Sequence, residues 1–433
     1  MRYGKVFRNT YAFLQKSQYW SREKLEKYQL LQLRKLLYHA YENVPYYRSV
    51  FDERGLKPRD IQDFEDIKKL PCMTKELFQR HFKEIIAKNT DFRGVHLSHT
   101  SGTTGRSLEF YEDNITSSVE WAFILEQWSR VGFVIGDKMA ELRGAPRDTT
   151  ITYDPLHKLL WLSPVDINKE RAKECLKALE KYKVKFLHGY PSAIAVFASV
   201  IRHFGIPVKV HLRSVLFASE IVYEWERRIV EEVFSCRVFS HYGMGEKVVL
   251  AGECEKSFDY HVFPQYSFVE LDEETNEIIG TSFLNYVNPF IRYKTTDVAG
   301  AVQWEGCRLC GRNYYPIIKG IEGRQEDLVL TPEGTFVSPA VLTWPFKVLN
   351  GIKETQIYQE AVDKMVVRVL PWHKADQEVV EKDKRRMLEG LRRIVGNGMV
   401  IVFEEVDEIP RTSVGKFQWV ISVPAKELIK KGI

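Results

Sequence analysis

The sequence has no apolar run near the ~20 residues that a helix needs to cross a bilayer. The segment from Met1 to Trp20 is basic and aromatic, and it lacks the apolar stretch of a secretory signal. Six cysteines in 433 residues are too few for the disulfide framework of a small secreted domain. These absences predict a cytoplasmic protein without a transmembrane segment.

A strong charge of one sign is also missing. The formal net charge is only +5, and no motif that reads DNA or RNA occurs, so we expect no nucleic-acid partner. Hydrophobic residues make up 44% of the chain and charged residues 28%, which is typical of a globular enzyme. The length predicts two or three domains.

Helical and strand-like segments alternate along the chain, which predicts an α/β fold with parallel strands. The first helical segment covers residues 21–56 and is punctuated at Pro45. Further helices are expected at 112–131, 170–183, 191–204 and 223–234, with strands at 186–190, 215–217 and 238–242. The chain is then rich in strands, which are expected at 267–271, 277–281 and 290–293.

A smaller α+β unit follows. Its strands are expected at 352–359, 365–370 and 400–405, and its helix at 375–395. We therefore predict a large N-terminal domain of layered α/β sheets at 1–323, helical over roughly residues 1–90. A small C-terminal domain would occupy 324–433.

Hydroxyl side chains alternate with glycines over residues 98–107, and Arg106 adds one cation. Glycines let a backbone approach a phosphate closely, and hydroxyls add donors without bulk. Short strands expected at 94–97 and 108–111 would make this run the loop of a hairpin. It is not a Walker A motif, because no G-K-[ST] ending is present. A solvated turn is the alternative interpretation.

Three later segments carry further polar groups. Glu246 follows a strand and a glycine turn, where a carboxylate can hold Mg²⁺; a surface turn is the alternative. Asp297 closes a strand and can accept ribose hydroxyls, although such residues also cap turns. Lys416 follows a glycine turn and can bring a point charge to a phosphate, or lie in a solvated loop.

In this order, the segments resemble the adenylate-forming superfamily of acyl-CoA synthetases, peptide-synthetase adenylation domains and luciferases. Residues 100–106 resemble its phosphate loop, T-S-G-T-T-G-K, with Arg for Lys. Residues 242–246 resemble Y-G-x-T-E, and residues 293–297 resemble Y-x-T-G-D. Residues 323–324 match the hinge motif, and Lys416 matches the lysine of the C-terminal motif.

Two departures stand out. Gly245 replaces the usual Thr or Ser, which removes a hydroxyl expected near the α-phosphate, and Thr296 replaces a Gly. The closest branch is identified as the phenylacetate–CoA ligase and CapK-like group, from the segments at 188–192 (H-G-Y-P-S) and 218–220 (A-S-E).

The resemblance implies a Mg²⁺-dependent ligase that uses ATP to form an acyl-AMP and pyrophosphate. It assigns catalytic roles to Lys416, Arg106 and Glu246, the last as the Mg²⁺ ligand. Gln325 and Glu326 would form the hinge about which the C-terminal domain rotates. The residues assigned to ATP or AMP are Ser101, Gly102, Thr103, Thr104, Gly105, Ser219, Glu220, Ile221, Tyr242, Gly243, Met244, Asp297 and Arg324.

The acceptor stays open. The phenylacetate group implies CoA, as in an aryl-CoA ligase of catabolism. The CapK-like branch implies an amine acceptor in capsule, surface-polysaccharide or specialised-metabolite biosynthesis. A non-catalytic nucleotide-binding protein on the same fold is disfavoured because Glu246 and Lys416 are present. A phosphotransferase is a further alternative, and it would release ADP rather than AMP. The sequence lacks the Walker A and kinase lysine motifs of such enzymes.

A structural Zn²⁺ site is predicted from two ligand pairs. Cys307 and Cys310 form a C-x₂-C pair, and Cys254 and His261 are spaced C-x₆-H. Pairs on separate segments suit a tetrahedral Cys₃His site. The Cys307–Cys310 pair could instead be redox-active, but the sequence around it lacks a thioredoxin-like βαβ pattern. The alternatives to His261 as fourth ligand are His241 and Glu253.

The acyl pocket has the weakest signal in the sequence. An arginine, Arg143, is a candidate partner for an anionic substrate or an ordinary surface residue. The oligomeric state stays open, a homodimer included. Candidate pocket residues, each of which can also be simple core, are Trp121, Leu125, His188, Tyr190 and Ser192.

Overall fold

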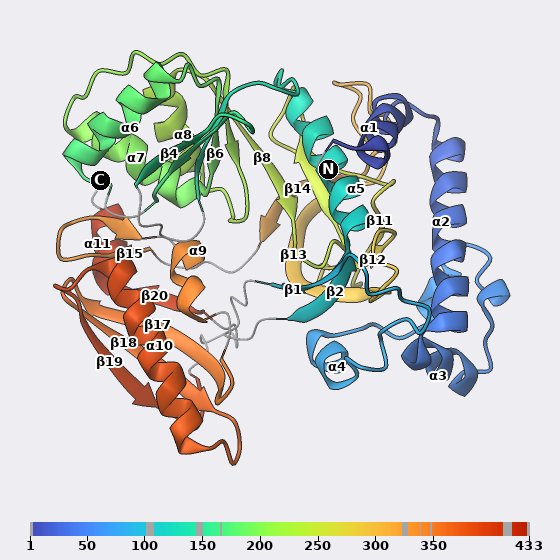
Figure 1. The fold of residues 1–433 in the computed structure, drawn as a ribbon. Helices are drawn as coiled ribbons and strands as arrows, with labels where there is room; N and C mark the ends of the chain where they lie inside the picture. Colours follow the sequence, from blue (N-terminus) through green and yellow to red (C-terminus); the bar gives the residue numbers. More distant parts are fainter. Residues whose placement is uncertain are drawn as a thin grey trace. The chain divides into compact units, whose positions relative to one another are not determined.

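The computed structural model describes residues 3–100, 108–143, 150–164, 167–322, 328–337, 339–346, 349–409 and 418–430 (Figure 1). The chain divides into two compact units. Unit 1 contains residues 1–100, 108–133 and 241–323, and unit 2 contains the rest. Both units mix helices and strands, so the predicted α/β class is confirmed. Among the described residues, no helix is long and apolar enough to cross a membrane.

Helices dominate the first part of unit 1. The helix expected over 21–56 is two helices, because Val44 is extended (φ −110°, ψ 110°) before Pro45. A residue before proline is disfavoured in the α region, which explains the break. The helices of unit 1 are α1 (Lys5–Ser17), α2 (Arg22–Asn43), α3 (Pro45–Glu53), η1 (Pro58–Asp60), η2 (Asp66–Lys69), α4 (Lys75–Arg80) and α5 (Asn114–Ser129).

The strands of unit 1 are antiparallel. The predicted hairpin is confirmed, with β1 (Val95–His99) paired to β2 (Glu109–Asp113). Asp113 ends β2 and caps α5, so that helix begins two residues later than expected. The other strands, in their order across the sheet, are β11 (Ser267–Leu271), β12 (Glu277–Ser282), β13 (Tyr293–Gln303), β14 (Ile317–Glu322), β10 (Tyr260–Val262), β9 (Leu250–Glu253) and the end of β8 (Arg237–Gly243).

The strand expected at 290–293 was wrong, because β13 begins only at Tyr293. Arg292 has a left-handed φ of +48°, which turns the chain before the strand. Its guanidinium donates to Glu270 and to the carbonyl oxygens of Lys68 and Leu70. Polar anchoring of Arg292 therefore sets where this strand starts.

Unit 2 begins with a parallel sheet in the order β8-β7-β6-β3-β5, with β4 antiparallel at its edge. Strand β8 contributes its first four residues, 237–240, here. Its helices and strands confirm the predicted alternation. They are β3 (Met139–Leu142), β4 (Ile151–Asp154), β5 (Leu159–Leu162), α6 (Lys169–Lys181), β6 (Phe186–Gly189), α7 (Pro191–His203), β7 (Ser214–Phe217) and α8 (Glu224–Phe234).

A second sheet of unit 2 has the order β19-β18-β17-β20, and α10 (Gln377–Val395) lies across it (Figure 1). Buried Val380, Met387 and Leu391 of α10 pack with Ile357 and Met365 of the sheet. The predicted strands and helix of this region are confirmed. Its elements also include β15 (Val329–Leu330), β16 (Phe336–Val337), α9 (Pro339–Leu342), η3 (Trp344–Phe346), β17 (Ile352–Ala361), β18 (Lys364–Pro371), β19 (Val400–Glu405), β20 (Val420–Ser422) and α11 (Val423–Lys430).

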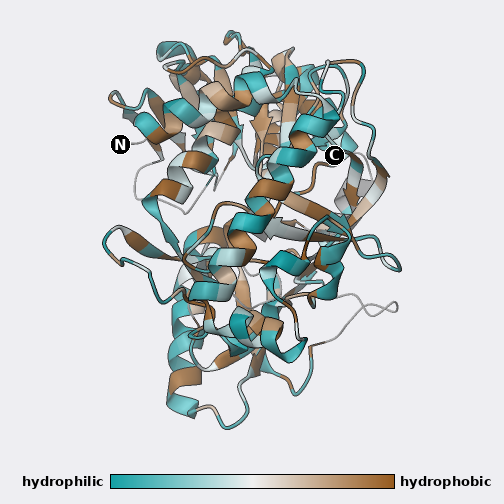
Figure 2. Ribbon diagram, turned by 90° about the vertical axis from the view of Figure 1, so that its right-hand side faces the viewer, coloured by the Kyte–Doolittle hydropathy of each residue, from teal (hydrophilic) through white to brown (hydrophobic). Residues whose placement is uncertain are grey.

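Each unit has its own apolar core. In unit 1 the core joins α2, α3 and the antiparallel sheet, with Leu33, Phe78 and Phe290 fully buried. Figure 2 shows hydrophobic and hydrophilic residues alternating along the helices, as expected where a helix buries one face. The domain boundary predicted at 323–324 and the hinge at Gln325 and Glu326 lie outside the described residues and stay predictions.

Thr296 gives a test of backbone strain in β13. Its φ is +66°, and a left-handed conformation costs an L-residue roughly 1–2 kcal/mol. Because Thr296 is exposed, Thr296→Gly removes little buried surface. We expect the free energy of unfolding in urea to rise by about 1 kcal/mol. Val298→Gly, in the same strand, should lower it, and a loss of stability in Thr296→Gly would contradict the strain.

Candidate active site and metal centre

The stem of the predicted phosphate loop is well defined. Thr100 donates its N–H to the carbonyl of Leu108 at 2.9 Å, and the N–H of Leu108 donates to the hydroxyl of Thr100 at 3.0 Å. This two-way pairing closes the hairpin just beyond β1 and β2. The loop residues lie outside the described residues, and so their roles stay predictions: Ser101, Gly102, Thr103, Thr104, Gly105 and Arg106.

The predicted ribose and magnesium residues are adjacent in unit 1. The hydroxyl of Tyr242 donates to Oδ2 of Asp297 at 2.8 Å. The hydroxyl of Tyr293 donates to Oε1 of Glu246 at 3.2 Å. Two motifs that are about 50 residues apart in the sequence are therefore joined by two tyrosine–carboxylate hydrogen bonds. Arg324 and Lys416 lie outside the described residues.

Burial changes the pKa values of Glu246 and Tyr242. It raises the pKa of Glu246, which is partly offset by the charge of Lys75 and the hydroxyl of Tyr293. Burial also raises the pKa of Tyr242 well above its usual value, with the Asp297 carboxylate adding to the effect. Tyr242 is therefore a neutral donor. A cation beside Glu246 would favour its ionised form.

Gly245, the main departure from the family motif, lies against the stem of the hairpin. A Cβ added at Gly245 would be 3.2 Å from Cγ2 of Thr100 and 3.9 Å from its Cα. A serine or threonine at position 245 therefore requires Thr100 to move. Packing against the stem gives a physical reason why glycine occupies this position.

The carboxyl ends of the parallel strands in unit 2 collect three charged or titratable side chains. Nη1 of Arg143 lies 3.3 Å from Nε2 of His188. Because arginine only donates, this contact makes Nε2 the acceptor and places the ring proton on Nδ1. Nδ1 lies 3.7 Å from Oε1 of Glu141. Arg143, which follows β3, and His188 on β6 are thus brought together as a polar cluster where α/β sheets bind ligands.

The segment predicted to line an adenine pocket lies beside the start of α7. Glu220 Oε2 accepts from the N–H of Ser192 at 3.1 Å and from its hydroxyl at 2.6 Å. A carboxylate at the first turn of a helix is favoured by the helix dipole. Ser219 has a left-handed φ of +72°. The hydroxyl of Ser192, a candidate for the acyl pocket, therefore helps hold the loop after β7.

The other acyl-pocket candidates divide between the units. Trp121 and Leu125 lie on α5 of unit 1, where Leu125 is buried and Trp121 meets Trp128 edge-on at 5.4 Å. Tyr190, in unit 2, is buried, and the guanidinium of Arg143 lies 5.6 Å from its ring centroid. Their role in substrate binding stays a prediction.

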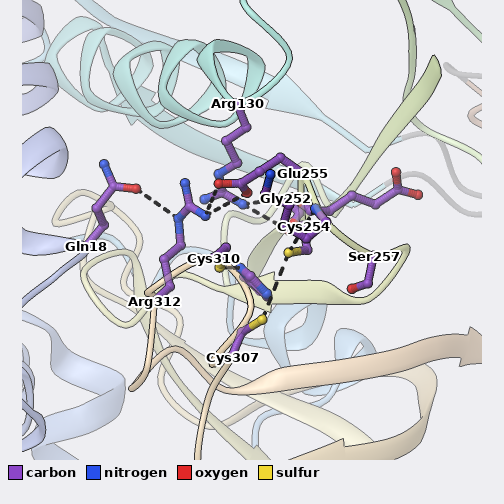
Figure 3. Close-up of polar contacts among 12 residues, drawn as sticks. Gln18, Arg130, Gly252, Cys254, Glu255, Ser257, Cys307, Cys310 and Arg312 are labelled. Atoms are coloured by element: carbon purple, nitrogen blue, oxygen red, sulfur yellow. Dashed lines mark hydrogen bonds and ion pairs between the residues drawn. The ribbon is translucent and has the colours of Figure 1, made fainter. Parts of the chain in front are cut away.

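The predicted metal ligands form one cluster in unit 1. The ligand atoms of Cys254, His261, Cys307 and Cys310 all lie within 4.8 Å of one another. Sγ of Cys254 and Sγ of Cys307 are 4.0 Å apart, and Sγ of Cys310 is 3.8 Å from Nδ1 of His261 (Figure 3). A zinc tetrahedron with its usual Zn–S bonds has sulfur–sulfur edges of about 3.8 Å. The four residues therefore fit Zn²⁺, and His241 and Glu253 are not in the group.

The cluster is buried and well supported. Burial lowers the pKa of His261, which keeps its imidazole neutral, as a metal ligand must be. The N–H of Lys256 donates to the sulfur of Cys254 at 3.3 Å. Hydrogen bonding from Cys310 lowers the pKa of the Cys254 thiol. Gly306 and Gly311 have φ near +80°, which forms the tight turns around the C-x₂-C pair.

Two arginines with buried side chains, Arg312 and Arg130, lie beside the cluster (Figure 3). Arg312 donates to both carboxylate oxygens of Glu255, at 3.0 and 2.7 Å, and to Oε1 of Gln18 at 2.8 Å. Arg130 donates to the carbonyls of Gly252 and Glu253, both at 3.1 Å. The segment that carries Cys254 is therefore fixed from two sides.

Sequence reasoning missed these arginines and a buried ion pair between Lys247 and Glu112, at 2.7 Å. No periodicity or motif marks a lysine that directly follows a family motif. The only feature of the sequence that points to Lys247 is its position next to Glu246. The packing of distant segments decides which of the many Lys and Glu residues are buried together.

The comparisons with known proteins agree with the motifs. The CapK C-terminal domain family matches residues 329–423. The phenylacetate-coenzyme A ligase of Pseudomonas putida is 25% identical over 389 residues, covering 84% of this chain and 86% of the relative. The indoleacetate–lysine synthetase of Pseudomonas savastanoi is 23% identical over 339 residues, covering 76% and 80%.

The fold agrees as well. A crystal structure of 2-hydroxyisobutyryl-CoA ligase in complex with 2-HIB-AMP and CoA aligns with a TM-score of 0.59 at 18% identity, covering 95% of this chain and 93% of that one. The likeness thus extends over nearly the whole chain. The chain is therefore similar to phenylacetate–CoA ligases over most of its length, shares the fold of the 2-hydroxyisobutyryl-CoA ligase structure, and matches the CapK C-terminal domain family over residues 329–423.

Proposed function

We propose that this protein is an AMP-forming ligase that adenylates a carboxylic acid and transfers the acyl group to CoA or to an amine. The observation that carries the proposal is the adjacency of Tyr242–Asp297 and Tyr293–Glu246 in unit 1. Asp297 would accept the ribose hydroxyls of ATP, and Glu246 would hold Mg²⁺. When bound, Mg²⁺ neutralises charge that develops on the phosphate oxygens.

The reaction has two steps, adenylation of the acid and transfer of the acyl group, and the first step needs little acid–base catalysis. A carboxylate oxygen of the acid attacks the α-phosphorus, and the bond to pyrophosphate breaks. The acceptor thiol or amine then attacks the acyl carbon, AMP leaves, and the acceptor loses its proton. The cations Arg106 and Lys416 would stabilise the charge of the first transition state. Their assignment rests on the family resemblance.

CoA is the first candidate acceptor. Relatives named as phenylacetate-CoA ligases match along most of this chain. The relative named indoleacetate–lysine synthetase and the CapK match favour an amine as second candidate, in capsule or other surface-polysaccharide biosynthesis. A reducing cytoplasm suits both, because it supplies ATP and keeps the cysteines reduced.

The four-residue cluster would hold a structural Zn²⁺. All four ligand atoms come from the protein, so the ion would have no open position for substrate. Its contribution would be to fix the segments around Cys254 and Cys307 against each other.

Adenylation is tested by ATP–pyrophosphate exchange with Mg²⁺ across aryl, fatty, amino and uronic acids. We expect exchange with one class of acid, and release of AMP rather than ADP. Lys416→Ala should lower exchange at least about 100-fold, because one charge-stabilising contact to the transition state is lost. Hydrolysis of supplied acyl-AMP should change much less. Equal losses in the two assays would contradict the role of Lys416.

The acceptor is tested next, with the acid that supports exchange. Single-turnover reactions with CoA, or with amino sugars and amino acids, are followed by mass spectrometry. A thioester that appears only with CoA identifies a CoA ligase, and an amide identifies the second candidate. Binding of ATP without exchange on any acid would instead favour a non-catalytic protein.

The zinc site is tested by metal analysis of the purified chain. We expect about one zinc per chain, and near-complete loss of zinc in Cys310→Ser together with a lower Tm. Cys72→Ser is the matched control, because Cys72 is a free cysteine outside the cluster. It should keep its zinc. Full zinc content in Cys310→Ser would rule out this ligand set.

A further inference from the structure

The residue after Glu246 has an unusual environment. The side chain of Lys247 is only 7% exposed, and its ammonium is 2.7 Å from Oε2 of Glu112 and 3.5 Å from Oε2 of Glu120. Nζ also donates to the carbonyl of Gly245 at 3.2 Å. Lysine is almost never this buried unless its charge is paired. The ammonium thus contacts both its own loop and a neighbouring strand and helix.

The charge of Lys247 is kept by its partners. Burial alone lowers the pKa of Lys247, but the carboxylates of Glu120 and Glu112 raise it overall. The hydroxyl of Tyr266 donates to Oε1 of Glu120 at 3.1 Å, which occupies the other side of that carboxylate. Lys247 therefore keeps its ammonium charge within this cluster of carboxylates.

Glu112 connects this cluster to the stem of the phosphate loop. It lies on β2 opposite His96 of β1, and its Oε1 accepts from the hydroxyl of Ser98 at 2.6 Å. Nε2 of His96 lies 3.3 Å from the same oxygen. One carboxylate thus holds the strand that enters the predicted phosphate loop with one oxygen and Lys247 with the other.

The backbone shows that Lys247 is held in place. Its φ is +57°, a left-handed conformation that costs an L-residue roughly 1–2 kcal/mol. Its N–H donates to the carbonyl of Met244 at 3.1 Å, which closes a tight turn around Gly245 and Glu246. Such strain persists only where the surroundings fix the conformation. The ion pair supplies that fixation at the C-terminal end of the turn.

We propose that Lys247 and Glu112 are positioning residues that hold the Glu246 turn against the stem of the predicted phosphate loop, so that the proposed magnesium ligand and this stem keep one relative placement. This inference rests on the proposed function for the identity of the ligand, MgATP. The contact between Gly245 and Thr100 adds a second link between the same two segments. A buried ion pair specifies which atoms of the two segments must meet, whereas apolar packing alone does not.

The first experiment tests the mechanical link without ATP. Amide hydrogen exchange is measured on the full chain carrying Glu112→Gln, Lys247→Met or Lys247→Arg. In Glu112→Gln, a change on the hairpin, we expect about tenfold faster exchange over residues 244–248, because local opening of the turn becomes easier. Lys247→Met should in turn speed exchange at 98–100. Lys247→Arg keeps the charge and should largely restore protection.

The matched control is Glu270→Gln, which breaks another buried ion pair of unit 1, with Arg292 at 3.0 Å. Glu270→Gln should lower the free energy of unfolding by a comparable amount. It should not speed exchange over 98–100 and 244–248 together. Unchanged exchange in Glu112→Gln, or the same pattern in the control, overturns the link. Glu112→Gln keeps the side-chain shape, so it decides the question if Lys247→Met does not fold.

The second experiment measures ATP binding by calorimetry over a range of Mg²⁺ concentrations. We expect the half-saturating Mg²⁺ concentration to rise about tenfold in Lys247→Met and Glu112→Gln, the lower end of the loss seen when residues that orient metal ligands are changed. Binding of ATP in EDTA should change much less. Equal weakening with and without Mg²⁺ would overturn the positioning role. If the wild type does not bind MgATP, the proposed function fails, and the exchange experiment still decides whether the two segments are linked.

Discussion

The ammonium of Lys247 and the carboxylates of Glu112 and Glu120 set the main constraint on the part of unit 1 that carries the candidate site. Lys247 and Glu112 are buried and Glu120 is partly buried, and a buried charge is tolerable only when it is paired at close range. The strand, the helix and the turn that carry these groups therefore have little freedom. Tyr242 lies on β8, just before the turn, and its partner Asp297 lies on β13, as does Tyr293, which pairs with Glu246 of the turn. The turn that this network restrains carries Glu246, the candidate magnesium ligand.

The sequence allowed much of the fold to be predicted, because alternating helices and strands carry strong periodic signals. The hairpin around the phosphate loop, the helices from α6 to α8 and the strands of the C-terminal sheet all agree with expectation. The predicted bounds were wrong where a single residue sets the backbone conformation against the hydrophobic pattern of the segment. Arg292 delays β13, and Val44 before Pro45 divides a helix that looked continuous.

The candidate site was predictable to the extent that it follows linear motifs. Glu246 and Asp297 were predicted from motifs that follow strands, and the cysteine–histidine pairs from their spacing; the structure brings the four metal-ligand candidates together. Residues without a motif, such as Arg130, Arg312 and Lys247, could not be found in this way. Their importance depends on which charges become buried beside one another, and that is decided by long-range packing rather than by spacing in the chain.

The close approach of Gly245 to Thr100 bears on how this sequence can change. Restoring the hydroxyl side chain of the family motif at position 245 would crowd Thr100, while a smaller residue at position 100 would leave a gap beside the glycine. Each substitution is therefore expected to be tolerated better with the other than alone, so that the two positions form an epistatic pair. Mutational routes back to the common motif would then pass through a less stable intermediate, and a lineage that has acquired this glycine will tend to keep it.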